Sequence, residues 1–300
     1  MGIRQGSVAV PFAVACCGIA TFAGMDVLMK DLSIDIGAYN AMLWRTGIAL
    51  LFILPLFLAR RIPWPARHVL KLHVWRGLVT SVMAFLFFWG LARVPLAEAI
   101  ALSFIAPLIA LYLAAMILRE HINQRAIIAS LVGFAGALVV ISGQLSGDYS
   151  AELVPGITAI LVSAVMYAYN LILQRQQALI AGPIEIALFQ SGTLVLVYLL
   201  FAPFFAVPPP VDSVPALTGA ALLSLTSILL LSWAYARAEA KVLVPVEYTA
   251  FIWAALFGWL VFEEMPTLAT LFGTALIVTG CLVAARQHPE DVEHVETTAV

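Results

Sequence analysis

Long apolar runs alternate with short polar breaks along the whole 300-residue chain. Each run is about 18–25 residues long, and a helix of that length crosses a bilayer core of about 30 Å. Charged residues, prolines and glycines mark the ends of the runs. The pattern predicts ten membrane-spanning helices, at roughly residues 8–29, 38–59, 72–91, 95–118, 124–143, 153–173, 185–206, 214–235, 243–262 and 267–285.

Composition supports this interpretation. Hydrophobic residues make up 63% of the chain and charged residues only 11%, whereas a soluble domain carries about 25% charged residues. A soluble fold could not bury so much apolar surface. The first run has no convincing cleavage site after it and is read as a span, not a signal peptide. We therefore expect an all-α polytopic membrane protein.

Positive charges are distributed unequally between the two sides that ten spans define. The side that carries both termini holds twelve of the fifteen Lys and Arg residues, the opposite side holds Lys30 and Arg93, and Arg45 lies within a span. The positive-inside rule then places both termini in the cytoplasm. The twelve residues are Arg4, Arg60, Arg61, Arg67, Lys71, Arg76, Arg119, Arg125, Arg175, Arg237, Lys241 and Arg286.

The chain contains an internal repeat. Shifting the sequence against itself by 144 positions aligns the predicted spans, and Trp89–Arg93 then matches Trp233–Arg237 as Trp-x-x-Ala-Arg. Each half has five spans, an odd number, so the second half enters the membrane from the other face. We expect inverted repeats at residues 1–143 and 144–285, followed by a disordered, acidic cytoplasmic tail at 286–300. Glu120 is then cytoplasmic and its equivalent Glu264 external.

Two segments carry a family resemblance. Residues 87–140, beginning FFWGLARVPLAEAIALSF, and residues 231–284, beginning LSWAYARAEAKVLVPVEY, each resemble one EamA-type unit of the drug/metabolite transporter superfamily. The shared features are an Ala-rich turn into a span, the central Pro107, a Glu just after that span and small residues in the last span. In the second half Phe251 stands at the Pro107 position and the proline is displaced to Pro245.

The resemblance covers about the whole chain. It implies ten helices, cytoplasmic termini, a place in the bacterial cytoplasmic membrane and export of small metabolites, often amino acids. Bacterial exporters of aromatic amino acids are one branch of this family. It implies no enzymatic activity and no cofactor.

Four charged residues in the predicted spans, Asp26, Arg45, Glu98 and Glu247, call for an explanation, because each costs about 2.5–3.5 kcal/mol there. Glu98 follows Pro95 into a helix, so its carboxylate faces the positive end of the helix dipole, at the external end where water is close. A pathway or proton-coupling role is the alternative. Glu247 lies near the cytoplasmic end of its span, either snorkelling to the interface or lining the inner mouth.

Asp26 and Arg45 lie near the external ends of the first two spans. A structural ion pair between the two helices is the first interpretation, and an external gate or a contact to substrate is the second. Lys30, four residues after Asp26, is a competing partner on the same helical face. Pro107 is a candidate flexing point for conformational change.

One helical face of the sixth span is polar, with Ser163, Tyr167, Asn170 and Gln174 spaced four, three and four residues apart. Such a face is unsuited to lipid, so it serves either interhelical hydrogen bonding or the lining of a pathway. The further residues expected to line the pathway are Thr80, Ser103, Ser224, Ser227, Glu247 and Tyr248.

Other chemistry finds little support. The sequence offers no nucleophile with a base, no phosphate-cradling loop and no basic surface for nucleic acid. The three cysteines sit in apolar segments and do not suggest a metal site. The last span of each half has two small residues seven positions apart, Ala129 and Gly136 in the first half and Gly273 and Gly280 in the second, which permit close helix packing. Whether the chain is a monomer or a homodimer stays open.

Three transport functions follow. The first is a secondary transporter that exports small amphipathic metabolites by alternating access, with aromatic or other neutral amino acids as the expected substrates. The second is a proton-coupled exporter of cationic drugs. Small multidrug carriers of the same superfamily use a glutamate in the middle of their first helix, and the middle of the first span here, VACCGIATFAG, has no carboxylate. The third is an exchanger of phosphorylated metabolites, which would need a cluster of Lys or Arg, whereas Arg45 stands alone among the predicted spans.

Overall fold

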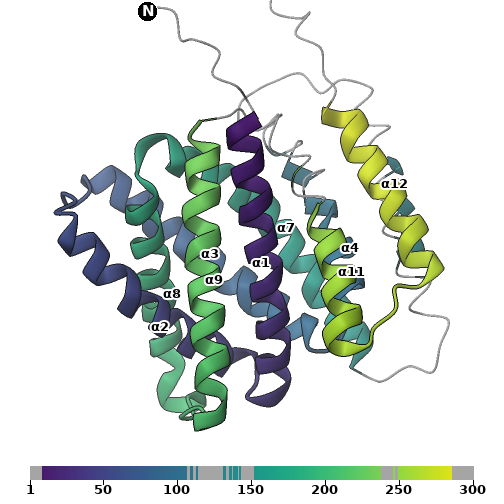
Figure 1. The fold of residues 1–300 in the computed structure, drawn as a ribbon, viewed down its shortest axis with the longest axis horizontal. Coiled ribbons are helices and arrows are strands. Elements are labelled where there is room, and N and C mark those ends of the chain that lie inside the picture. Colours follow the sequence, from purple (N-terminus) through teal and green to yellow (C-terminus); the bar gives the residue numbers. More distant parts are fainter. Residues whose placement is uncertain are drawn as a thin grey trace, which may run out of the picture.

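The computed structural model describes residues 9–106, 109–110, 113, 131–132, 135–136, 138–140, 142, 152–237, 246 and 249–285. These residues form helices joined by short turns, with no strand among them (Figure 1). Six of the described helices are long and apolar enough to cross a membrane. The predicted fold class, an all-α polytopic membrane protein, is confirmed.

The described helices follow the predicted spans. The first half contains α1 (Ala9–Asp35), α2 (Ala38–Ala59), α3 (Arg67–Leu91) and α4 (Leu96–Ser103), the last being the start of the fourth span. The second half contains α7 (Leu153–Ile180), α8 (Pro183–Phe205), the short 3-10 helix η1 (Val211–Ser213), α9 (Val214–Tyr235), α11 (Thr249–Phe262) and α12 (Leu268–Ala285). Helices α1 and α7 continue past the predicted ends at residues 29 and 173, because hydropathy marks where a chain leaves hydrocarbon and not where its helix ends.

Helices in equivalent places of the two halves run in opposite directions. Phe57, late in α2, packs against Phe189, early in α8, with ring centroids 6.4 Å apart. Tyr39, early in α2, packs against Phe205 at the end of α8, at 5.7 Å. The pair α2 and α8 is therefore antiparallel, which is the arrangement that an inverted repeat requires.

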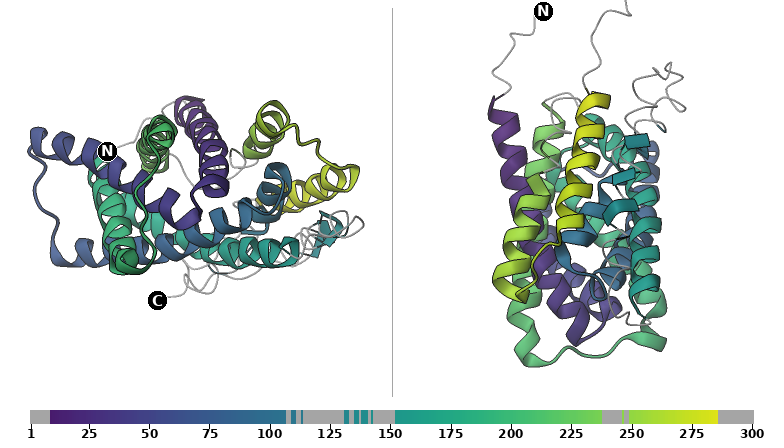
Figure 2. Two further views of the ribbon diagram at one scale, coloured as in Figure 1. Left: turned by 90° about the horizontal axis from the view of Figure 1, so that it is seen from below. Right: turned by 90° about the vertical axis from the view of Figure 1, so that its right-hand side faces the viewer.

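The contacts between the halves also follow the repeat: replacing each helix of a contacting pair by its equivalent in the other half gives another contacting pair. Helix α1 packs on α9, and their equivalents α7 and α3 pack on each other. Along the first pair, Gly18 lies beside Leu231 and Gly219 lies beside Leu28, so these helices are antiparallel. Seen from its end, the molecule is a flattened bundle in which helices of both halves stand side by side (Figure 2).

The Trp-x-x-Ala-Arg motif ends α3 and α9 in the same way. Arg93 Nη1 donates to the carbonyl oxygen of Trp89 at 2.8 Å, and its Cζ lies 3.7 Å from the indole centroid. Arg237 makes both contacts with Trp233, at 3.1 and 4.1 Å. A cation at a helix C-terminus is favoured by the dipole, and a guanidinium is favoured over an indole face. The repeated sequence thus encodes a repeated helix end.

The last spans of the two halves meet at glycines. A Cβ atom on Gly136 would lie 2.5 Å from the carbonyl oxygen of Gly273, and one on Gly273 would lie 2.6 Å from that of Gly136. Residues without side chains are needed where backbones come this close. The predicted close packing at these two glycines is confirmed.

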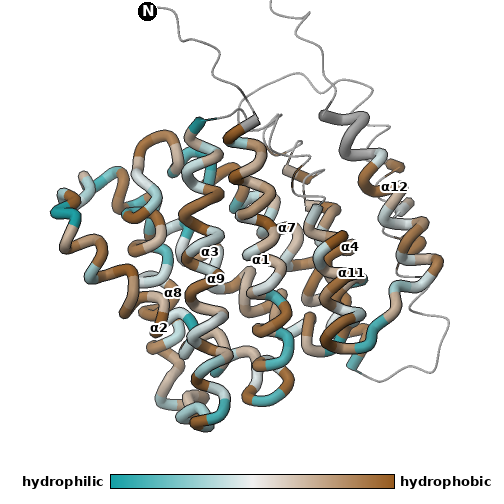
Figure 3. The backbone as a smooth tube through the Cα atoms, viewed as in Figure 1, coloured by the Kyte–Doolittle hydropathy of each residue, from teal (hydrophilic) through white to brown (hydrophobic). Residues whose placement is uncertain are grey.

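The outer surface of the bundle is apolar. Leu51, Leu200 and Phe204 are 72%, 73% and 79% exposed, and many other large apolar side chains are exposed with them. Hydrophilic residues gather mainly near the helix ends, whereas apolar residues predominate along the helices (Figure 3). Such a surface suits contact with acyl chains and not with water. The chain is an integral membrane protein.

Candidate functional site

A cavity of about 180 Å³ lies among helices of both halves. Helices α1, α2, α3 and α4 of the first half contribute to its wall, together with α7, α8, α9 and α11 of the second. Its volume is below the roughly 300–1,000 Å³ of pockets for drug-sized ligands, so the cavity suits a small metabolite. Aromatic rings form part of the wall, namely those of Phe22, Phe87, Phe88, Phe104 and Tyr167.

The predicted pathway residues that the structure describes all line this cavity. They come from four helices, α3 and α4 of the first half and α7 and α9 of the second. They are Thr80, Ser103, Ser163, Tyr167, Asn170, Ser224 and Ser227. Asp26 and Arg45, predicted as a gate or an ion pair, line the same cavity. Pro107, Glu247 and Tyr248 lie outside the described residues.

The polar face of α7 both faces the cavity and joins α7 to α3. Ser163 Oγ donates to the carbonyl oxygen of Met83 at 2.8 Å. Thr80 Oγ1 donates to Asn170 Oδ1 at 3.1 Å. Asn170 and Ser163 are each 3% exposed. The two interpretations left open by the sequence, interhelical bonding and cavity lining, describe the same side chains.

Asp26 and Arg45 do not form the predicted ion pair. Among the described residues, no nitrogen–oxygen distance of 4.0 Å or less joins them. Arg45 Nη1 donates instead to Ser224 Oγ at 2.7 Å, and its Nη2 contacts Met42 Sδ at 3.6 Å. The guanidinium is thus held by a hydroxyl of α9, a helix of the other half that the sequence does not place beside α2.

Arg76 is the cavity residue that the sequence interpretation missed. The charge count assigns it to a cytoplasmic segment, although it falls within the predicted span 72–91. In the structure it is 5% exposed and lines the cavity. Its Nε donates to Asn170 Oδ1 at 3.1 Å, and its Nη1 donates to Gln177 Oε1. The expectation that Arg45 stands alone is therefore wrong.

Four polar atoms in the cavity wall have no hydrogen-bond partner among the described residues. They are Asp26 Oδ1, Arg45 Nε, Gln190 Oε1 and Ser227 Oγ. A buried polar atom without a partner costs about 1–3 kcal/mol. All four atoms belong to residues that line one cavity, so a polar molecule bound there could supply their missing hydrogen bonds.

Glu98 lies outside the cavity wall. It occupies the first turn of α4 after Pro95, as predicted. It is only 2% exposed, however, and accepts a hydrogen bond at 3.0 Å from Thr270 Oγ1 of α12. The expectation that water lies close to this carboxylate is wrong, because α12 of the other half packs over it.

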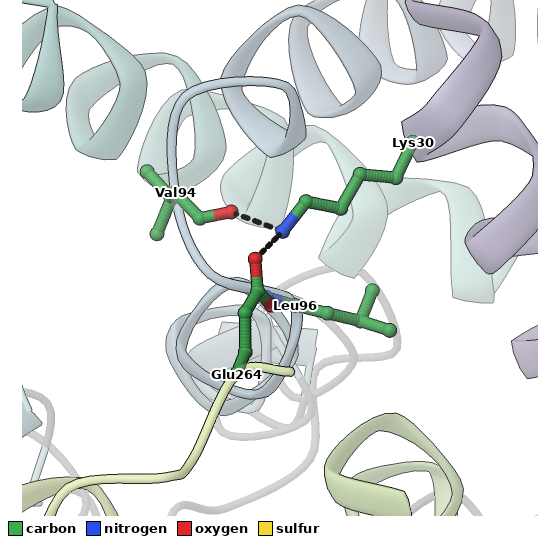
Figure 4. A network of polar contacts seen from close by, with 4 residues as sticks. All are labelled: Lys30, Val94, Leu96 and Glu264. Carbon is green, nitrogen blue, oxygen red and sulfur yellow. Dashed lines mark hydrogen bonds and ion pairs between the residues drawn. The ribbon is translucent and has the colours of Figure 1, made fainter. Parts of the chain in front are cut away.

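A separate polar network joins the two halves near the end of α1 (Figure 4). Lys30 Nζ donates to the carbonyl oxygen of Val94 at 3.2 Å and forms an ion pair with Glu264. Glu264 Oε2 accepts from the backbone N–H of Leu96 at 2.7 Å. The predicted competition of Lys30 for Asp26 is wrong, since its carboxylate partner lies in the other half of the chain.

Glu264 acts as an N-terminal cap for a helix of the other half. Leu96 is the first residue of α4, and its N–H has no partner within that helix. A carboxylate there satisfies the N–H and faces the positive end of the dipole. Glu264, the repeat equivalent of Glu120, therefore has a structural role, because it stabilises the start of α4.

Comparison with known proteins gives two matches to one family model. The EamA-like transporter family matches residues 11–142 and again residues 154–286. A solved crystal structure, 21% identical in sequence, superposes with a TM-score of 0.64 over 92% of this chain and 96% of that chain. This likeness shows a shared fold.

Several relatives of known name span nearly the whole chain. A pseudopaline exporter of Pseudomonas aeruginosa is 28% identical, covering 89% of this chain and 92% of its own length. A riboflavin transporter of Rhizobium johnstonii is 29% identical, with 90% and 88% covered. An S-adenosylmethionine uptake transporter of Rickettsia prowazekii is 22% identical, with 86% of each chain covered.

Proposed function

Starting from the fact that this chain belongs to the EamA-like transporter family, and so is a membrane transporter of small metabolites, we propose that it exports amino acids or close derivatives. The names of the relatives state different substrates, so the substrate of this chain must be argued from its own cavity. Membership of a transporter family supports transport as its activity.

The observation that carries the proposal is the mixed chemistry of the cavity wall. Asp26 and Arg45 offer opposite charges, each with an atom that lacks a partner among the described residues. Hydroxyl groups of Ser224 and Ser227 lie in the same wall as aromatic rings such as Phe104. A carboxylate and an ammonium group suit the charged residues, and an apolar side chain suits the rings.

Transport proceeds by alternating access between the inverted halves. The cavity lies where helices of both halves meet, so movement of one half against the other exposes it to each side in turn. The Lys30–Glu264 network ties the halves at one end of the bundle and breaks and reforms during the cycle. The proposal keeps Pro107 as the point at which its helix flexes during this movement.

The proposal also fixes an orientation. Both termini lie in the cytoplasm, because the breaks after alternate spans hold the great majority of the Lys and Arg residues. Placing Arg76 in the cavity, instead of in a loop, leaves this asymmetry intact. The host membrane is the bacterial cytoplasmic membrane, and export runs from the cytoplasmic face outward.

Export of cationic drugs is less well supported. Of the described residues lining the cavity, Asp26 is the acidic one and Arg45 and Arg76 are basic. A wall with this balance repels a cationic ligand. Glu98, considered as a substitute proton carrier, bonds to Thr270 outside the cavity.

Exchange of phosphorylated metabolites is the second candidate. Arg76 joins Arg45 in the cavity wall, and two guanidinium groups supply the donors that a phosphate prefers. Asp26 in the same wall opposes a ligand that carries only negative charge.

Counterflow in proteoliposomes tests the proposal. Purified protein is reconstituted into vesicles, and each radiolabelled compound of a panel of amino acids, sugar phosphates and quaternary amines is offered to vesicles loaded with the same compound unlabelled. We expect uptake of amino acids above that of protein-free vesicles, and a severalfold reduction by Asn170→Ala or Ser224→Ala. Uptake of sugar phosphates alone would establish the second candidate instead.

A further inference from the structure

Two buried arginines in the cavity have neutral hydrogen-bond partners among the described residues. Arg45 and Arg76 are each 5% exposed. Arg45 donates to the Ser224 hydroxyl, and Arg76 donates to the side-chain oxygens of Asn170 and Gln177. In the described part of the chain, no carboxylate oxygen lies within 4.0 Å of either guanidinium.

Such an arrangement is costly unless an anion completes it. A charged group inside the membrane costs about 2.5–3.5 kcal/mol on insertion scales, and it is normally paired. Lys30, which is also buried, follows that rule, because it has Glu264 as its partner. The two arginines that lack a carboxylate are the two that line the cavity.

The hydrogen bonds of the arginines fix their position without neutralising them. Ser224 in α9 holds Arg45 of α2, whereas Asn170 and Gln177 in α7 hold Arg76 of α3. Each guanidinium thus belongs to the first half and is positioned by a helix of the second. Five N–H donors on each guanidinium leave further donors for a carboxylate, and Arg45 Nε has no partner among the described residues.

Asp26 adds one negative charge to the same wall, and its Oδ1 has no hydrogen-bond partner among the described residues. The charged lining residues that the structure describes therefore sum to one excess positive charge. We propose, as a refinement of the amino-acid proposal above, that the substrate carries two carboxylates and one ammonium group. It is an acidic amino acid, or an amino acid extended by a second carboxylate, and not a neutral one.

The assignment of groups is then specific. Arg45 and Arg76 each bind one carboxylate, and Asp26 binds the ammonium group. The ammonium requirement separates this class from sugar phosphates, which have no cation for Asp26. The second carboxylate separates it from aromatic and aliphatic amino acids, which would leave one guanidinium unpaired.

The experiment is competition counterflow with wild-type protein in proteoliposomes. Labelled glutamate, glutamine, phenylalanine and a sugar phosphate are compared at equal concentration. We expect glutamate to exchange at least about tenfold faster than glutamine, which has the same size but lacks the second carboxylate, a difference of about 1.4 kcal/mol. Arg76→Gln should remove this preference, while Arg175→Gln, an exposed residue of the same helix bundle, should keep it.

The outcomes separate the two proposals. Equal exchange of glutamate and glutamine by wild-type protein overturns the two-carboxylate inference and leaves amino-acid transport standing. Exchange of the sugar phosphate without any amino acid overturns both. Because Arg76→Gln could also weaken the α3–α7 contact, thermal melting of the purified variant is measured, and Arg76→Lys, which keeps the charge, should recover part of the glutamate preference.

Discussion

The ion pair between Lys30 and Glu264 should contribute to the stability of the contact between the two halves. Lys30 is buried, with 4% of its side chain exposed, and Glu264 is partly covered, at 24%. Glu264→Gln leaves the ammonium group with the Val94 carbonyl oxygen at 3.2 Å and the face of the Phe262 ring, whose centroid is 4.7 Å away. The amide of glutamine still accepts from the backbone N–H of Leu96, so the change removes a charge and keeps the cap.

The expected loss of folding free energy in Glu264→Gln lies between two limits. Removing one partner of a fully buried pair costs about 3–5 kcal/mol, whereas an exposed pair contributes about 0–1 kcal/mol. Because Glu264 is 24% exposed and solvent screens it in part, we expect a loss of about 2 kcal/mol. At about 2–4 °C per kcal/mol, the melting temperature should fall by roughly 4–8 °C.

The assay is thermal melting of purified protein in detergent, with Glu263→Gln as the matched control. Glu263 is the adjacent residue and is exposed, and no ion pair of the described residues includes it. A double-mutant cycle with Lys30→Met isolates the pair, with an expected coupling of about 1–2 kcal/mol. A Glu264→Gln melting curve that coincides with that of Glu263→Gln would refute the reasoning.

Three further predictions concern the cavity and the packing around it. Ser227→Ala should leave the melting temperature unchanged or raise it, because its hydroxyl lacks a partner among the described residues, but should raise KM for transport severalfold. Asn170→Ala should lower stability by about 1–3 kcal/mol, since Arg76 and Thr80 both lose an acceptor, as read from melting curves. Gly273→Leu should abolish the monodisperse peak in size-exclusion chromatography, because its Cβ would lie 2.6 Å from a backbone oxygen of the facing helix.

The fold was predictable because its determinants are local or periodic. Apolar runs of bilayer length predict helices regardless of what they pack against. The repeat offset was recoverable because Arg93 and Arg237 end their helices by the same contact with a tryptophan four residues earlier. Both are properties of a few neighbouring residues, which a sequence displays directly.

The candidate site was predictable as a set of polar faces but not as a set of partners. The spacing of Ser163, Tyr167 and Asn170 identifies one helical face, and the structure places that face in the cavity wall. Asp26 and Arg45 were expected to pair because their helices are neighbours in sequence. Their actual contacts depend on which helix of the other half crosses at that height, and the sequence does not state that.

Two errors share this origin. Arg76 was counted as a loop charge, although its acceptors Asn170 and Gln177 lie on α7, about a hundred residues away in the chain. The sequence offers Lys30 as a competing partner for Asp26 on the same helix, whereas the structure pairs it with Glu264 of the other half. A charge in a predicted span should therefore be checked against polar residues of the opposite repeat before a local partner is assigned.

Access to the cavity from water is the most direct test of the whole account. In a variant from which Cys16, Cys17 and Cys281 have been replaced, a single cysteine is introduced as Ser227→Cys. The comparison is Leu222→Cys, because Leu222 lies on the outer face of the same helix and is 45% exposed. In proteoliposomes, a charged thiol reagent should label position 227 during transport, substrate should slow that labelling severalfold, and position 222 should stay unlabelled because acyl chains cover it. Labelling at 222 with none at 227, or labelling at 227 that substrate leaves unchanged, would contradict a substrate cavity between the two halves.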